Sequence, residues 1–283
     1  KTLFPYTTLF RSGRLGGGAL THASDLDMVF LFTGDHAAES DGGRPLGATL
    51  YFNRLAQRVI AALSVPTAEG ALYEVDTRLR PSGEQGPMAV SFDSFTRYQR
   101  ESAWTWEHMA LARARALYGS QAARDQLNSI IRAVLEMPRD PTKLRADVLE
   151  MRSTMALHKP AKGPLDVKLA RGGLVDAEFI VHFLQLRDHI ALEPSIPMAL
   201  AALAEAGKLG PAALEAHRAL ARFLIASRLL APDGTEPDPG AKAVLASTCE
   251  SGDWHAMTEQ LAESRRVLAA AWTATFGEEL EIV

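Results

Sequence analysis

Hydrophobic residues in the first half of the chain follow both strand and helix spacings. Residues 28–32 form an unbroken apolar run of strand length, which is typical of a strand covered on both faces. Residues 72–79 alternate apolar and charged, which predicts a second strand with one charged face. Apolar residues at helical spacing predict helices over residues 52–63, ending before Pro66, and over residues 92–111. This half therefore predicts a mixed sheet with helices.

Beyond residue 140 nearly every periodic stretch has helical spacing, and no run of strand type occurs. Asp140 followed by Pro141 is typical of an N-cap and a first helical residue, and it opens an apolar stripe at i, i+4, i+7 and i+11. Further helices are predicted over residues 174–190, 198–206, 211–231 and 254–276. Short connections between them indicate an antiparallel helical bundle. The fold class is therefore α+β, with a mixed unit over residues 13–135 and an all-α bundle over residues 136–283.

The first twelve residues share no pattern with the rest of the chain. The string KTLFPYTTLFRS does not begin with Met, Pro5 interrupts any apolar signal-peptide core, and no small-x-small cleavage site comes after it. It resembles translated sequencing adapter joined in frame to an incomplete gene. We therefore expect residues 1–12 to be an extraneous leader outside the fold.

Composition narrows the class of protein. The chain has 283 residues, 47% of them hydrophobic, so it is long enough for a sizeable core. A net charge of −4 and no basic patch argue against a nucleic-acid partner. No apolar run reaches the roughly 20 residues of a membrane helix. The single cysteine, Cys249, suits a reducing compartment, so a cytoplasmic protein without a membrane partner is expected.

Paired carboxylates precede the buried strand. Asp25 and Asp27 are separated by one residue, and the two-residue period of a strand places both on one face. Two Mg²⁺ ions can each take such a carboxylate and bridge the phosphate oxygens of a nucleotide. Asp76, on the charged face of the second strand, is the natural third ligand and a candidate proton acceptor. A D-x-D pair is also common by chance in loops and caps, so the surrounding residues decide its meaning.

The residues upstream strengthen that interpretation. Gly16 and Gly17 would let backbone N–H groups approach phosphate oxygens, although a flexible turn is the ordinary alternative. Ser24 directly precedes the pair. The order of glycines, Ser24, D-x-D, buried strand, helix and third aspartate is more specific than any one of these features.

Several charged residues have two open interpretations. Arg78 and Arg80 share a predicted strand face with Asp76 and are either phosphate ligands or an ordinary charged edge. Arg113 and Arg115 are weaker candidates, because i, i+2 spacing separates them on a helix, and they would mark its end. His108 is expected to be a packed or exposed helical residue, because it has no second histidine at ligand spacing.

Residues 172–178 (GGLVDAE) open a largely apolar helix. Asp176 is explained by the helix dipole. Glu178 is expected to be buried and to need a partner, for which Lys168 is the candidate. The two residues would then either help close the site or form an internal ion pair.

Longer strings carry a resemblance to a known family. GRLGG, SDLDMVFLF, PTAEGALYEVDTRLRPSGEQGP, YQRESAWTWEHMALARAR and KLARGGLVDAEFIVHFLQL closely resemble the adenylyltransferase half, the C-terminal half, of the bacterial bifunctional glutamine synthetase adenylyltransferase/adenylyl-removing enzyme. The resemblance covers nearly all of the chain after the leader. Gly18-Ala19-Leu20 departs from it, since the family usually has a larger residue followed by an acidic one.

The resemblance implies a polymerase-β-like nucleotidyltransferase domain followed by a helical bundle. It implies transfer of AMP from ATP, with Mg²⁺, to a tyrosine of glutamine synthetase, with release of pyrophosphate. Asp25, Asp27 and Asp76 would bind the metal, and Gly16 and Gly17 would form the phosphate-side turn.

Two alternatives stay open. One is the sister activity, phosphorolytic removal of AMP from glutamine synthetase, although PSGEQGP and AWTWEHMALARAR resemble the transferase half. The other is a noncatalytic module that docks on glutamine synthetase or on a PII signal protein. The latter contact would involve the full-length protein.

Overall fold

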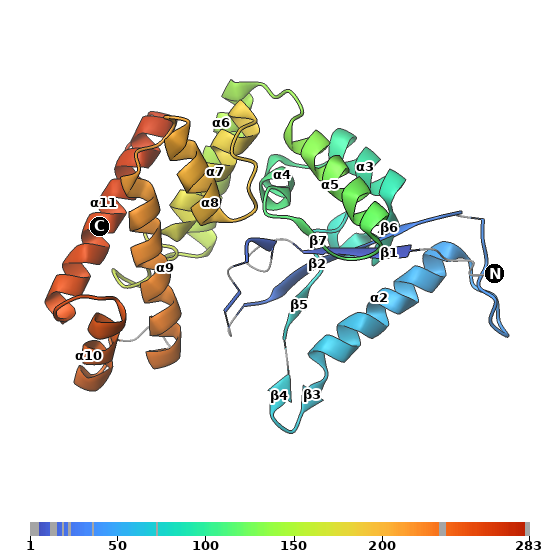
Figure 1. Cartoon of the computed structure of the whole chain (residues 1–283), viewed down its shortest axis with the longest axis horizontal. Coiled ribbons are helices and arrows are strands. Elements are labelled where there is room, and N and C mark those ends of the chain that lie inside the picture. Colours follow the sequence, from blue (N-terminus) through green and yellow to red (C-terminus); the bar gives the residue numbers. More distant parts are fainter. Residues whose placement is uncertain are drawn as a thin grey trace. The chain divides into compact units, whose positions relative to one another are not determined.

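The computed structural model describes residues 6–11, 16–18, 20–21, 24–35, 37–71, 73–231 and 236–280. Two compact units form, Lys1–Met137 and Pro138–Val283, whereas the sequence pattern predicts a boundary after residue 135. The first unit combines a mixed sheet with helices, and the described part of the second unit contains helices and their connections (Figure 1). An α+β protein is therefore confirmed.

Strand β2 (Leu26–Thr33) is the centre of the sheet. Its neighbours are β1 (Tyr6–Arg11) on one side and β5 (Val75–Asp76) with β6 (Ala89–Ser91) on the other. β1 runs antiparallel to β2 and also to β7 (Arg115–Tyr118), whereas β5 and β6 run parallel to β2. A separate hairpin joins β3 (Pro66–Thr67) and β4 (Gly70–Ala71). β2 is buried on both faces, as its unbroken apolar run predicts.

The expectation that residues 1–12 lie outside the fold is wrong for the part that the structure describes. Residues 6–11 form β1, which pairs with β2 over six residues and with β7. Tyr, Thr and Phe favour strands, and β1 pairs with β2 on one side and with β7 on the other. Phe10 is buried against Phe95, with ring centroids 5.4 Å apart. Residues 1–5 and 12 lie outside the described residues.

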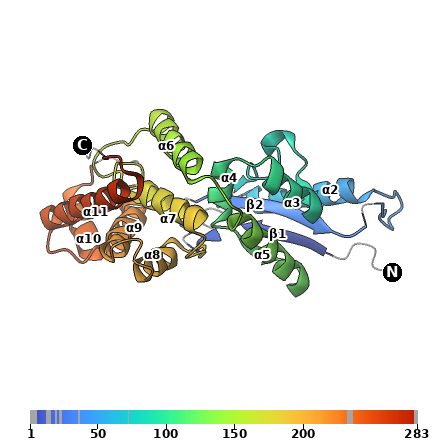
Figure 2. The same ribbon diagram turned by 90° about the horizontal axis from the view of Figure 1, so that it is seen from above.

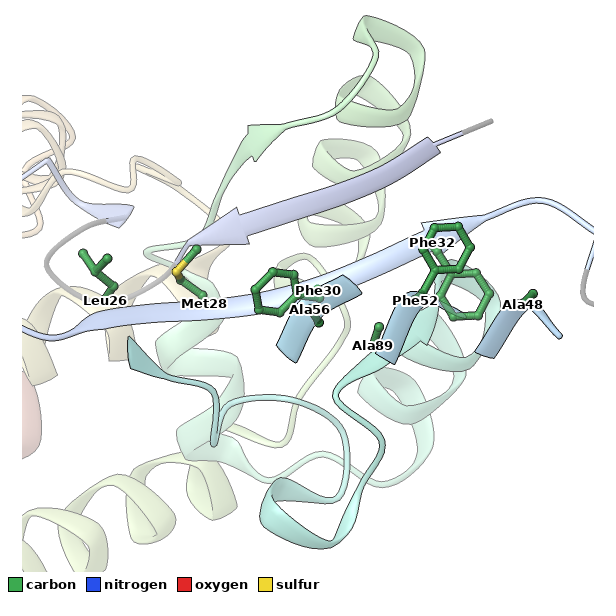
Figure 3. Packing of buried hydrophobic residues seen from close by; sticks show 8 residues of the cluster. All are labelled: Leu26, Met28, Phe30, Phe32, Ala48, Phe52, Ala56 and Ala89. Atoms are coloured by element: carbon green, nitrogen blue, oxygen red, sulfur yellow. The ribbon is translucent and has the colours of Figure 1, made fainter. Parts of the chain in front are cut away.

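Helices cover both faces of the sheet. α2 (Ala48–Ser64) lies on one side, and α3 (Phe92–Glu101) and α5 (Gln121–Leu135) lie on the other (Figure 1), and Figure 2 shows the same elements from above. Alternate residues of β2 pack on α2, and Phe32 stacks on Phe52 at 4.6 Å (Figure 3). The core cluster on this side comprises Leu26, Met28, Phe30, Phe32, Ala48, Phe52, Ala56 and Ala89. Asp27, between two core positions of β2, therefore faces away from α2.

Two predicted elements differ in extent. Of residues 73–79, which the structure describes, only Val75 and Asp76 form the expected strand, because the ladder to β2 ends there and Arg78 enters a turn. The helix expected over residues 92–111 is divided into α3 and α4 (Thr105–Leu111). Glu107 caps the second piece by accepting a hydrogen bond from the Trp104 N–H at 2.8 Å, and this cap starts a new helix.

The second unit packs α7 and α11 against α9 and α6 against α7, with α8 and α10 joining at the edges. Asp140 caps α6 as predicted, accepting hydrogen bonds from Thr142 and Lys143. The helices predicted from apolar spacing are present, whereas α5 and α10 were not foreseen. The bounds are α6 (Pro141–His158), α7 (Leu174–Asp188), α8 (Ile196–Glu205), α9 (Ala212–Leu230), α10 (Pro239–Thr248) and α11 (Trp254–Phe276). No helix in the described ranges has the length and apolar character to cross a membrane.

Asp188, at the end of α7, forms ion pairs in this unit whose contribution to stability depends on pH. Its carboxylate accepts hydrogen bonds from Arg187 at 2.6 Å and 2.8 Å and pairs with Lys208 at 3.0 Å. The hydrogen bonds from Arg187, opposed by burial and aided by Lys208, lower the pKa of Asp188 from 3.8 to about 2. As the pH falls, Asp188 is therefore protonated at a higher pH in the unfolded chain than in the folded protein.

Asp188→Asn is expected to destabilise the protein at neutral pH. The contribution of Asp188 is complete above pH 3.8 and is lost as the pH falls toward about 2, so the deficit of the variant should shrink over that range. Urea unfolding near pH 7 and near pH 3 measures the stability of the variant relative to the parent chain. Glu205→Gln, at an exposed position, is the control. A deficit of equal size at both pH values would contradict this prediction.

Candidate functional site

The paired aspartates lie where β2 begins. Asp25 is exposed just before the strand, and Asp27 is half-buried within it. In the parallel ladder Asp27 stands opposite Asp76 of β5, and the Leu26 N–H donates to the Glu74 carbonyl at 2.8 Å. The sheet thus brings together the three carboxylates that the sequence pattern singled out. Asp25 and Asp76 also line a cleft of about 420 Å³ together with Glu74, Val75, Thr77, Arg78, Arg80 and Glu84.

Asp76 is engaged by Arg78. Its carboxylate accepts a hydrogen bond from the Arg78 backbone N–H at 2.8 Å and from Nε and Nη2 at 2.9 Å and 2.5 Å. These hydrogen bonds hold the pKa of Asp76 below its usual value, against the opposing effect of burial. The Arg78 side chain is 69% exposed, so solvent screens the pair.

The pKa of Asp27 is shifted in the opposite direction from that of Asp76. Burial raises the pKa of Asp27 first, and the negative charges of Asp76 and Asp25 raise it further, whereas Arg113 and Arg78 lower it. Ionisation of Asp27 is therefore less favourable than ionisation of an ordinary exposed aspartate. Perturbed carboxyl groups beside a cleft are characteristic of functional sites.

Arg80 does not share a face with Asp76, because the strand has ended. Its guanidinium is buried and donates to the carbonyls of Thr77, Glu84 and Gly86 and to the Thr77 hydroxyl. These contacts close the loop after β5. Both arginines line the cleft, but the Arg80 guanidinium is held by the loop, whereas the Arg78 side chain is exposed.

Ser24 positions the chain entering the site. Its hydroxyl oxygen accepts a hydrogen bond from the Thr21 N–H at 3.1 Å and lies 2.8 Å from the Thr21 hydroxyl. The Ser24 N–H donates to the Thr21 carbonyl at 3.1 Å. These contacts of Ser24 are all with Thr21, and they lie directly before Asp25.

The glycine run lies near a basic residue of β7. Gly16 is buried and Gly17 half-buried, and Gly18 has a left-handed backbone with φ of 74°. A Cβ at Gly18 would lie 3.6 Å from Nη2 of Arg115. Ala19 lies outside the described residues, as do His22, Ala23 and Leu72.

Arg113 and Arg115 matter more than their sequence spacing indicated. α4 ends at Leu111, so both residues come after the helix and the argument from i, i+2 spacing on a helix does not apply. Arg113 is buried and its charge lowers the pKa of Asp27. Their basic character was visible in the sequence, but only the fold brings Arg115, the first residue of β7, near Gly18 and Arg113 near Asp27.

The donor set suits a hard divalent cation, since carboxylate oxygens are the ligands that Mg²⁺ prefers. Within the described residues, however, no three acidic, histidine or cysteine side chains converge at metal-binding distances. Asp76 points its oxygens at Arg78. Asp25, Asp27 and Asp76 fit a cation in chemistry and strand register, and a shared ion would require Arg78 to release Asp76.

The remaining sequence candidates are structural. His108 is buried, with Nε2 2.9 Å from the Gln99 carbonyl, which confirms a packed helical residue. In the second unit two parts of the expectation about the GGLVDAE helix are wrong: Asp176 is fully buried and pairs with Arg152 at 2.5 Å, so the helix dipole does not account for it, and Glu178 is half-buried rather than buried. The apolar neighbours of Glu178 were misleading because the helix inserts its Asp176 face into the core.

Known proteins resemble this chain over most of its length. Residues 9–130 match the family model described as glutamate-ammonia ligase adenylyltransferase. The chain is 42% identical over 279 residues to a protein of Brucella suis biovar 1 named bifunctional glutamine synthetase adenylyltransferase/adenylyl-removing enzyme, covering 95% of this chain and 28% of that protein.

Two further relatives bear the same name. The protein of Agrobacterium fabrum is 51% identical over 175 residues, covering 62% of this chain and 18% of the relative. That of Rhizobium meliloti is 41% identical over 268 residues, covering 91% of this chain and 27% of the relative. The chain thus spans less than a third of the length of the relatives it matches. Over the part that it spans, the chain belongs to the glutamine synthetase adenylyltransferase family.

Proposed function

We propose that this chain transfers AMP from Mg-ATP to a tyrosine of glutamine synthetase, releasing pyrophosphate and so regulating nitrogen assimilation. The observation that carries the proposal is the parallel register of Asp27 and Asp76, with Asp25 at the same end of β2. A central strand that carries such a pair beside a strand with a third aspartate supports a polymerase-β-like nucleotidyltransferase fold. Family membership supports the acceptor.

In the proposed reaction the tyrosine oxygen bonds to the α-phosphorus of ATP, and the bond from that phosphorus to the pyrophosphate oxygen breaks. Mg²⁺ would neutralise phosphate charge when bound. Asp25, Asp27 and Asp76 would hold it. Release of Arg78 would remove the hydrogen bonds that hold the pKa of Asp76 down, and Asp76 would then receive the phenolic proton. Arg78 would move from Asp76 to the phosphates, and Arg113 would balance the charge of Asp27.

The site acts, in this proposal, in the cytoplasm and without nucleic acid or membrane. A PII signal protein would reach it through the full-length protein. Gly16, Gly17 and Gly18 would provide backbone donors near Arg115, on the phosphate side of the site.

Incubation with glutamine synthetase, Mg²⁺ and α-labelled ATP tests the proposal. We expect label on a tyrosine and stoichiometric pyrophosphate. In a parallel reaction, adenylylated glutamine synthetase and inorganic phosphate should release little ADP. ADP release without label transfer would assign the adenylyl-removing activity instead. Co-purification with glutamine synthetase without either reaction would assign a docking module, and both outcomes contradict the proposal.

A further inference from the structure

A buried carboxylate outside the proposed ligand set lies in the first turn of α4. Glu107 is 6% exposed, and its Oε2 accepts a hydrogen bond from the Trp104 N–H at 2.8 Å. The Tyr98 hydroxyl, from α3, donates to the same carboxylate and lies 2.9 Å from Oε1 and 3.2 Å from Oε2. Burying a carboxylate is costly unless it is hydrogen-bonded, so the Tyr98 hydroxyl and Glu107 tie α3 to α4.

The Tyr98 hydroxyl also contacts the loop after β5. Burial, the largest effect, and the hydrogen bond to Glu107 raise the pKa of Tyr98, whereas a hydrogen bond with the Ser82 backbone lowers it. A hydrogen bond lowers the pKa of a phenol when the phenol oxygen accepts it, so the Ser82 N–H is the donor. One hydroxyl therefore connects three segments of the first unit, namely α3, α4 and the loop.

Ser82 belongs to the loop over residues 77–86, which forms one wall of the carboxylate cleft. Hydrogen bonds from the buried Arg80 guanidinium to three carbonyls of this loop fix its internal shape. These contacts begin and end within the loop, so they do not determine where the loop lies relative to α3 and α4. The hydrogen bond between Ser82 and Tyr98 provides such a restraint.

The backbone around Ser82 is closely packed. Ser82 has a left-handed conformation, with φ of 64°, which is uncommon for a residue with a side chain and persists where the surrounding structure holds it. A Cβ at Gly86 would lie 2.0 Å from the Pro81 carbonyl oxygen, so the two ends of this turn are in direct contact. A displacement of Ser82 would therefore move its neighbours in the loop as well.

Arg78 is the residue of this loop whose position matters most for the proposed reaction. Its side chain is 69% exposed and reaches the cleft from the backbone of the loop. A long side chain loses conformational freedom when it binds a ligand, and a preorganised backbone lowers that cost. Functional groups are held in place by the residues behind them. The contacts of Ser82 are thus part of the support of Arg78.

We propose that Tyr98 is a positioning residue for nucleotide binding: oriented by Glu107, its hydroxyl holds Ser82 and thereby keeps Arg78 at the phosphate side of the cleft. This inference rests on the proposed function, in which Arg78 contacts the phosphates of ATP. It gives Tyr98 and Glu107, both in the string YQRESAWTWEHMALARAR, a role at the site without contact with the substrate.

Tyr98→Phe tests the proposal, because it keeps the aromatic ring and removes the hydroxyl. We expect the variant to bind α,β-methylene-ATP with Mg²⁺ about tenfold more weakly, the scale of one lost hydrogen bond. Isothermal titration calorimetry on the full chain measures this affinity. The KM for ATP should rise by a similar factor, while the KM for glutamine synthetase stays unchanged. Tyr118→Phe, at an exposed position of β7, is the matched control and should change neither value.

A double-variant cycle tests whether Tyr98 acts through Arg78. Arg78→Met by itself should weaken binding of the analogue. Adding Tyr98→Phe to it should cause a further loss of about twofold or less, because effects that pass through one contact are not additive. Fully additive losses, or an unchanged affinity in Tyr98→Phe, would overturn the inference and leave the proposed function in place.

Hydrogen–deuterium exchange gives a measurement that does not depend on the nucleotide. Tyr98→Phe should speed the exchange of backbone amides in residues 78–86 about tenfold and leave those of α5 unchanged. Unchanged exchange in the loop would overturn the inference even if the affinity for the analogue falls. Faster exchange in a chain whose parent does not bind the analogue would limit Tyr98 to a structural role, and it would overturn both the inference and the proposed function.

Discussion

Asp27→Asn is expected to lower the rate of adenylyl transfer to glutamine synthetase by about a thousandfold or more. A bound metal stabilises transition-state charge by several kcal/mol, and every 1.36 kcal/mol is a factor of ten in rate. Asn keeps the shape of Asp27 but not its charge, so the cation site that we propose with Asp25 and Asp76 would lose its central ligand. Label transfer from α-labelled ATP under Mg²⁺ saturation measures the loss.

The same variant is expected to fold at least as stably as the parent chain near neutral pH. Burial and the charges of Asp76 and Asp25 raise the pKa of Asp27, so the folded protein holds that proton more tightly than the unfolded chain. The stability contribution of Asp27 therefore falls as the pH rises from 3.8 through the raised pKa. Urea unfolding should show an advantage for Asp27→Asn near pH 7 that narrows toward pH 3.8.

Asp41→Asn is the matched control, because Asp41 is an exposed carboxylate of the same unit outside the cleft. It should leave both rate and stability unchanged. Wild-type activity in Asp27→Asn would remove Asp27 from the proposed ligand set. Loss of activity accompanied by a lower midpoint of unfolding would instead indicate a structural role, contrary to our expectation.

Asp176→Ala is expected to destabilise the helical unit by about 3–5 kcal/mol, the range found when one partner of a buried ion pair is removed. The Arg152 side chain is 2% exposed and Asp176 is fully buried. The substitution would leave the guanidinium in the core without its counter-charge, and it would also remove the acceptor of the Gly172 N–H. Urea unfolding of the full chain, followed by circular dichroism at a helix-sensitive wavelength, measures the change.

A double variant separates the buried charge from the packing. Arg152→Met combined with Asp176→Leu removes both charges, and we expect it to recover much of the stability lost in Asp176→Ala, because an apolar pair can replace a buried ion pair. The control is Glu215→Ala, which breaks the exposed pair with Arg218 at 2.7 Å and should have little effect. A small effect of Asp176→Ala, similar to that of Glu215→Ala, would show that the buried pair does not hold the segment before α7.

The sequence by itself determined the elements whose signals are local. The apolar run before residue 33 defines β2, Asp140 and Pro141 define the start of α6, and spacing at i, i+4 defines the other long helices of the second unit. It also determined the candidate carboxylates, because D-x-D at the mouth of a buried strand is visible in the letters. These features depend on residues within a few positions of each other.

Only the tertiary structure decided which of these residues meet. Register between β2 and β5 places Asp27 opposite Asp76, and the end of that short ladder turns Arg78 back onto Asp76 while Arg80 closes a loop. Alternation along residues 72–79 could not reveal where the ladder ends, because a strand ends where its partner no longer pairs with it.

Burial was likewise decided by packing. The letters of residues 6–11 favour a strand, but they do not show that this strand pairs with both β2 and β7. Similarly, Asp176 and Glu178 lie two positions apart on the same apolar helix, and the letters do not show which of them is buried. Which carboxylate enters the core depends on Arg152 of another helix, 24 residues away in sequence. The spacing of apolar residues shows which side chains share one face of a helix or strand. The element that packs on that face is determined by contacts between residues far apart in the chain.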